Sequence, residues 1–204
     1  MKPTPSVIAL LTVAVSLVVS MVAGQAARAA SQTTDLITQG RQALDAERVD
    51  EAITTFEKAI AADSKDPAAL AWLGSAQVRK ARSAPPVDAP GWVKKGFNTL
   101  DEAVERFPEA FVVYMVRGIT ALRVPEMFKK TPVAVSDLRA VVAMKDKNAN
   151  AVPDSAMPSV YLNLGLAHKK NGQAAEARAA WETARKLYPS APESDAITKE
   201  LQKL

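Results

Sequence analysis

A glycine in an apolar, helix-like context recurs along this sequence, and that recurrence constrains the fold more than any other feature. The four glycines are Gly40, Gly74, Gly118 and Gly165. The first two lie 34 residues apart, and the later intervals of 44 and 47 residues indicate insertions. Periods of this size are typical of solenoids, in which copies of one helical unit stack and bury a face that a single copy leaves exposed.

Each unit also carries a small, a large and a small residue in a fixed order. In VDEAITTFEKAI, residues 49–60, these are Ala52, Phe56 and Ala59. Spacings of four and three residues place them on one helix face. We expect a helical hairpin in which the glycine and the first alanine let two backbones approach, while the bulky residue fills the space between neighbouring hairpins. The bulky residues of the other units are Leu100, Leu138 and Trp181.

These residues resemble the tetratricopeptide repeat (TPR). The resemblance rests on the 34-residue period, on LAWLG (70–74) and AITTFEKA (52–59), and on the endings RFP (106–108) and LYP (187–189). Gly96 departs from the family pattern, in which alanine is usual at that position. The resemblance implies an all-α fold, a right-handed superhelix of about four TPR-like helical hairpins with a C-terminal capping helix. The predicted domain covers 30–204, with repeats at approximately 33–66, 67–110, 111–148 and 158–191 and the cap at 192–204.

The first 29 residues have the layout of a secretory signal peptide. Lys2 precedes an apolar run at 7–22, and the small-residue pattern Ala27-Arg28-Ala29 follows it. The run has 16 residues, fewer than the roughly 20 that span a bilayer. Cleavage after Ala29 is therefore favoured over an uncleaved membrane anchor. We expect an exported bacterial protein that is periplasmic or secreted and has no membrane span after cleavage.

The residue types limit the chemistry that the chain can perform. Cysteine is absent and His168 is the single histidine, so disulfides, thiolate metal sites and multi-histidine sites are excluded. Asp146, Asn148 and Asn150 begin like a calcium loop, but Ala151 stands where that loop needs glycine. We interpret His168 as a packed residue. The sequence therefore predicts no catalytic residue, no metal, no cofactor and no enzymatic activity.

The charge balance argues against a nucleic-acid partner. Loss of Lys2 and Arg28 with the leader lowers the count of Lys and Arg from 26 to 24, against 22 Asp and Glu. A nucleic-acid-binding domain would show a basic stripe instead. Together with the repeats, this balance favours a non-catalytic scaffold or adaptor whose partner is a protein or a peptide.

In the family that this chain resembles, the first helix of each repeat lines a concave groove. Residues three before, one after and five after each glycine are four apart and share one helix face. In repeats three and four they form an apolar floor of Met115, Ile119, Leu162 and Leu166. Along one edge they form a basic row of Arg79, Arg123 and Lys170. This pattern differs from that of the family members that bind carboxylates through lysine and asparagine. We expect a partner segment with an apolar face and acidic residues at one edge. The predicted groove residues are Arg41, Arg79, Met115, Ile119, Arg123, Leu162, Leu166 and Lys170.

Two alternatives remain open at this level. The basic row could instead complement the dipoles at the C-terminal ends of helices. The insertions at 83–91 and 124–132 could cover the groove, in which case the chain would be a structural assembly subunit whose groove is filled by its own insertions. Long connections on a solenoid are often functional, which is why their position matters.

Overall fold

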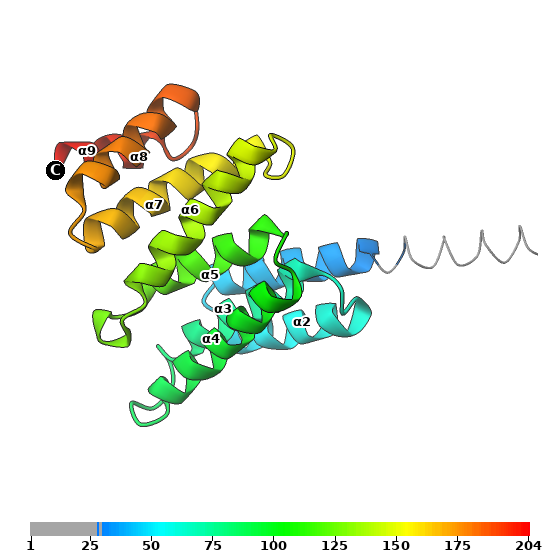
Figure 1. Cartoon of the computed structure of the whole chain (residues 1–204). Coiled ribbons are helices and arrows are strands. Elements are labelled where there is room, and N and C mark those ends of the chain that lie inside the picture. Colours follow the sequence, from blue (N-terminus) through cyan, green and yellow to red (C-terminus); the bar gives the residue numbers. More distant parts are fainter. Residues whose placement is uncertain (1–27, 29) are drawn as a thin grey trace, which may run out of the picture.

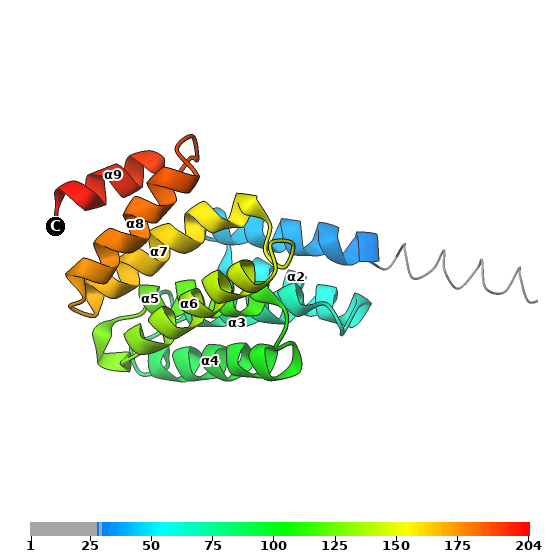
Figure 2. The same ribbon diagram turned by 45° about the horizontal axis from the view of Figure 1, so that its top comes forward.

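The computed structural model describes residues 28 and 30–204, in which all regular structure is helical (Figures 1 and 2). The predicted signal peptide at 1–29 lies outside the described residues, except for Arg28. The first helix covers residues 30–45. The helices that follow are α2 (Val49–Ala62), α3 (Pro67–Lys80), α4 (Ala89–Arg106), α5 (Phe111–Arg123), α6 (Thr131–Lys147), α7 (Met157–Lys170), α8 (Ala174–Leu187) and α9 (Ser194–Gln202), with short 3-10 helices η1 (Glu126–Phe128) and η2 (Asp154–Ala156).

Consecutive helices pair into four hairpins (Figure 1). The helix at 30–45 packs on α2, α3 on α4, α5 on α6, and α7 on α8. In addition α3 packs on α5, and α5 on α7, so the first helices of these hairpins follow one another in a row. The last helix, α9, closes the stack against α8 and α7 (Figure 2). The predicted all-α solenoid of four hairpins with a capping helix is confirmed.

The bulky residue of each unit packs on the glycine of its own hairpin. A Cβ on Gly40 would lie 2.5 Å from Phe56 Cε1, and a Cβ on Gly118 would lie 3.0 Å from Leu138 Cγ. Both bulky side chains are fully buried. The expectation that they fill the space between neighbouring hairpins was therefore only partly right. Phe56 does stack on Trp72 of the second hairpin, with 6.5 Å between ring centroids, but the same ring also covers Gly40.

Local sequence signals set the ends of the helices. Asp66 precedes α3, and its carboxylate accepts hydrogen bonds from the backbone N–H groups of Ala68 at 2.8 Å and Ala69 at 3.0 Å. Pro67 occupies the first helical position, where its missing N–H costs nothing. Gly172 links α7 to α8 with a φ of +76°, a left-handed conformation that favours glycine. These signals fix where the second hairpin begins and where the fourth hairpin turns.

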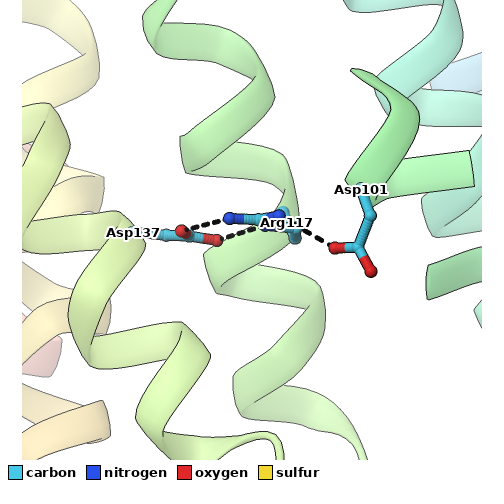
Figure 3. A network of polar contacts seen from close by, with 3 residues as sticks. All are labelled: Asp101, Arg117 and Asp137. Atoms are coloured by element: carbon cyan, nitrogen blue, oxygen red, sulfur yellow. Dashed lines mark hydrogen bonds and ion pairs between the residues drawn. The ribbon is translucent and has the colours of Figure 1, made fainter. Parts of the chain in front are cut away.

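A network of three charged residues ties the second hairpin to the third (Figure 3). Arg117 on α5 donates two hydrogen bonds to Asp137 on α6, both at 2.8 Å, and a third at 2.8 Å to Asp101 on α4. Asp137 is 2% exposed. Its burial raises its pKa, an effect that the Arg117 guanidinium opposes, while the same pairing raises the pKa of Arg117. The forked geometry fixes the relative positions of α4, α5 and α6.

Candidate functional site

The predicted apolar floor lies on the neighbouring helices α5 and α7. Met115, Ile119, Leu162 and Leu166 are all half-buried, and each packs against the main hydrophobic core with part of its side chain. Because α5 contacts α7, the two pairs of side chains belong to adjacent first helices of the solenoid. These four side chains therefore form an apolar strip that is only partly exposed to solvent.

Arg41 lies apart from this strip, in the first hairpin. Its guanidinium carbon is 5.0 Å from the centroid of the Trp72 ring, and its side chain is exposed. Trp72 in turn stacks on Phe56. The cation over the aromatic face is a stabilising contact in its own right, so Arg41 already has a role between the first and second hairpins.

The three members of the predicted basic row have different surroundings. Lys170 donates to the backbone carbonyls of Leu122 at 3.1 Å and Val124 at 3.0 Å, and it lies 3.6 Å from the carboxylate of Glu126. Helix α5 ends at Arg123, so Lys170 satisfies carbonyls at a helix C-terminus. For this residue, the alternative that the basic row complements helix ends agrees with the geometry.

Arg79 is only partly neutralised. Its terminal nitrogen lies 2.8 Å from Glu47, a carboxylate that is 66% exposed. Its Nε is buried and has no hydrogen-bond partner within the described residues. A buried donor without an acceptor is destabilising by itself, so Arg79 is not fully satisfied by its partners within the described residues.

Arg123 forms no hydrogen bond or ion pair in the part of the chain that the structure describes. Desolvation lowers its pKa, the positive charges of Arg79 and Arg82 lower it further, and Asp45 opposes them. Arg123 therefore lies close enough to Arg79 and Arg82 for their charges to act on it. Arg82 makes no ion pair among the described residues either. The result is a local concentration of positive charge at the C-terminal ends of α3 and α5.

These arginines line a pocket of about 370 Å³. It lies between α3, α4, α5 and the insertion at 124–132, and most of its wall is apolar. Met115 is two helical turns away from Arg123 on α5, so the pocket and the apolar strip are neighbouring but separate features. Arg79 and Arg123 were predicted from the sequence. Arg82, which follows Arg79 by three residues, was not, nor were the wall residues Ala89, Val93 and Phe128.

The remaining polar candidates have structural partners. His168 is 5% exposed, and its Nδ1 lies 2.9 Å from Oε1 of Gln173 at the turn between α7 and α8. Asn148 accepts a hydrogen bond from the backbone N–H of Asn150 at 3.0 Å, which closes a local turn after α6. Among the residues that the structure describes, no group of three or more histidine, aspartate or glutamate side chains is arranged to hold a metal ion.

The comparisons with known families identify the repeats. Family models of the tetratricopeptide repeat match residues 37–84 and residues 158–191. The chain is a tetratricopeptide repeat protein. The two matches cover the N-terminal and C-terminal parts of the solenoid, which are also the parts in which the sequence pattern of the TPR is most regular. No curated protein matches the chain.

Solved structures share this fold. A thermophilic TPR protein from Thermus thermophilus, TTC0263, is 19% identical, with a TM-score of 0.50 over 84% of this chain and all of that one. The crystal structure of the MamA protein is 20% identical, with a TM-score of 0.48 over 85% of this chain and 88% of that one. Similarity to the Thermus protein supports the TPR solenoid and nothing finer. TPR proteins are typically non-catalytic and mediate protein–protein interactions, which indicates an interaction scaffold.

None of the helices in residues 28 and 30–204 is both long enough and apolar enough to cross a bilayer.

Proposed function

We propose that this TPR protein is a non-catalytic, exported scaffold that holds a peptide or protein segment in the groove lined by α3, α5 and α7. The observation that carries the proposal is the strip formed by Met115, Ile119, Leu162 and Leu166. These side chains are anchored in the core on one side and reach solvent on the other. Contiguous apolar surface of this kind usually marks an interaction site.

The geometry of the strip favours an amphipathic helix or an extended segment as the partner. Met115 and Ile119 are one turn apart on α5, and Leu162 and Leu166 are one turn apart on α7. Two adjacent rows with this spacing accept apolar side chains that project from one face of a partner segment. Arg123 at the end of α5 would then attract an acidic residue at one edge of that segment.

Each insertion leaves one large apolar side chain in solvent, although Val124 and Phe128 of the second insertion pack against the core. Val87 in the first insertion is 84% exposed, and Met127 in the second is 79% exposed. A segment that filled the groove would place such side chains against the strip. Their exposure supports the scaffold over the alternative of an assembly subunit whose groove is filled by its own insertions.

Site-specific photo-crosslinking tests the proposal. A photoreactive amino acid at Met115 should crosslink a partner in envelope extract. The same group at Leu187, an apolar residue that is 55% exposed on α8, should not. Met115→Asp should weaken binding of that partner, once purified, by about tenfold or more, because it places a charge in an apolar contact. If the two positions capture the same proteins, or if Met115→Asp binds as well as the wild type, the groove is not the binding surface.

Export is tested separately. Protein recovered from the periplasm or the medium should begin at or near Ala30, as N-terminal sequencing would show. A product that keeps Lys2 and stays in the membrane fraction would contradict the proposed cleavage.

A further inference from the structure

We propose that the pocket between α3, α4, α5 and the second insertion binds a small amphiphile with one carboxylate head and an apolar body. The pocket shares Arg79 and Arg123 with the predicted groove but contains no residue of the partner-binding strip, so the inference goes beyond the proposed function. A volume of about 370 Å³ lies at the small end of the range for small-molecule sites. The pocket is therefore suited to a ligand of modest size.

The walls of the pocket favour a ligand with an apolar body. Val78 on α3 and Val93 on α4 are almost completely buried, and Phe128 of η1 is half-buried beside them. All three side chains line the pocket. Ser75 and Thr120, also in its lining, hydrogen-bond to each other at 2.9 Å, which reduces the demand of these two hydroxyl groups for a further polar partner. An aliphatic or aromatic group placed here would replace water against apolar atoms.

The rim of the pocket favours a ligand with a negatively charged head group. Arg79, Arg82 and Arg123 line the same pocket, and the last two reach solvent at its mouth. The carboxylates set against them are Glu47, which pairs with Arg79, and Asp45, which acts on Arg123. Two negative charges against three leave one positive charge in excess. A head group with a single negative charge completes this balance, so a carboxylate fits better than a dianionic phosphate.

The buried Nε of Arg79 has no hydrogen-bond partner in the part of the chain that the structure describes. It is a charged donor, and its side chain lines the pocket. Guanidinium groups bind carboxylates through paired N–H donors. A carboxylate at the rim would pair with the guanidinium groups there and would also relieve the repulsion from Arg79 and Arg82, which adds to desolvation in lowering the pKa of Arg123.

Titration of the purified full chain with octanoate tests the inference. Calorimetry should show saturable binding, and the NMR signal of the Arg79 Nε–H group should shift. Octanol lacks the charge and acetate lacks the body, so both should bind at least about tenfold more weakly. Arg82→Gln and Arg123→Gln should each weaken octanoate binding about tenfold, since each removes a charged donor. Arg139→Gln, an exposed arginine on α6 outside the pocket, should bind as the wild type does.

A bulky substitution in the pocket wall tests the inference independently. Ala89 lines the pocket at the start of α4, so Ala89→Phe should block octanoate, whereas Ala89→Ser should not. The inference is overturned if octanol binds as tightly as octanoate, or if both arginine variants bind like the wild type. It is also overturned if octanoate fails to bind while these variants lose a protein partner, because the pocket would then belong to the partner. Retained octanoate binding by Met115→Asp would separate the pocket from the groove.

Discussion

Gly74 and Gly96 face each other across the second hairpin so closely that neither position has room for a methyl group. A Cβ on Gly96 would lie 2.6 Å from the carbonyl oxygen of Gly74, and a Cβ on Gly74 would lie 2.9 Å from that of Gly96. Alanine is usual at the second of these positions in TPRs. Here the backbones of α3 and α4 have moved into the space that the alanine methyl group would occupy.

Gly96→Ala should therefore destabilise the protein by about 1–3 kcal/mol, because the added methyl group meets backbone atoms that cannot move independently. Gly91 is the matched control on the same helix, since a Cβ there would have no neighbour within 4 Å. Gly91→Ala should stabilise by about 0.5–1 kcal/mol by removing backbone freedom from the unfolded chain. Chemical denaturation of the two variants measures both effects. Equal shifts would contradict the close approach of α3 and α4.

In the first hairpin, both shrinking the large residue and enlarging the small one should destabilise the protein. Phe56→Ala leaves a cavity in a fully buried position and should cost about 3–5 kcal/mol. Ala52→Leu overfills a position that is 0% exposed and should cost about 1–3 kcal/mol. Ala61→Leu places the same added volume on the exposed face of α2 and serves as the control. Thermal melts in which all three variants overlay the wild type would show that the packing face is assigned wrongly.

The two carboxylates around Arg117 should differ in their contribution to stability. Asp137→Asn breaks the forked pair in a buried position and should cost about 2–3 kcal/mol, reduced from the value for a fully buried pair because Arg117 is 17% exposed. Asp101 is 50% exposed, so Asp101→Asn should cost less than about 1 kcal/mol. Urea denaturation provides both values. A larger loss for Asp101→Asn than for Asp137→Asn would rule out this interpretation.

The contact of α9 with the solenoid should weaken in acid. Hydrogen bonds from Lys203 and Lys169 lower the pKa of Glu200 in the folded state. The stabilisation that this carboxylate provides is therefore present above the usual pKa of glutamate, and it is lost as the pH falls through the lowered value. Melting temperatures of the wild type and of Glu200→Gln should differ near neutral pH and converge in acid. Glu182→Gln, on α8, removes only an exposed pair at 4.0 Å and should change the profile little. A constant difference at every pH would contradict the linkage.

The hairpins could be predicted because their signals are local and repeated. Gly40 and Phe56 are 16 residues apart within one unit, as are Gly165 and Trp181, whereas longer intervals separate the glycine from the bulky residue in the second and third units. The apolar strip could be predicted for the same reason, since Met115 and Leu162 occupy equivalent positions relative to their glycines. Whether the strip binds a partner stays a prediction.

The pocket and the charged network could not be predicted in this way. Phe128 lies in an insertion that interrupts the period, so no repeat position relates it to α3 or α4. Arg82 lies in the connection after α3, where the family pattern has no equivalent. The pairing of Arg117 with Asp137 depends on the angle between two helices, which residue spacing alone does not define.

The hydrophobic core of this solenoid is divided. Ala43, Leu44, Val49, Ala52 and Phe56 form a small cluster with Leu73 and Ala76 of α3, separate from the large cluster that runs to α9. Ile60 and Trp72, both half-buried, are the apolar side chains that touch the two clusters. In a linear array, each unit is stabilised only by its neighbours. A weak contact next to the terminal unit therefore favours local unfolding of that unit while the others stay folded. We therefore expect the first hairpin to open locally at a lower cost in free energy than the hairpins that hold α5 and α7.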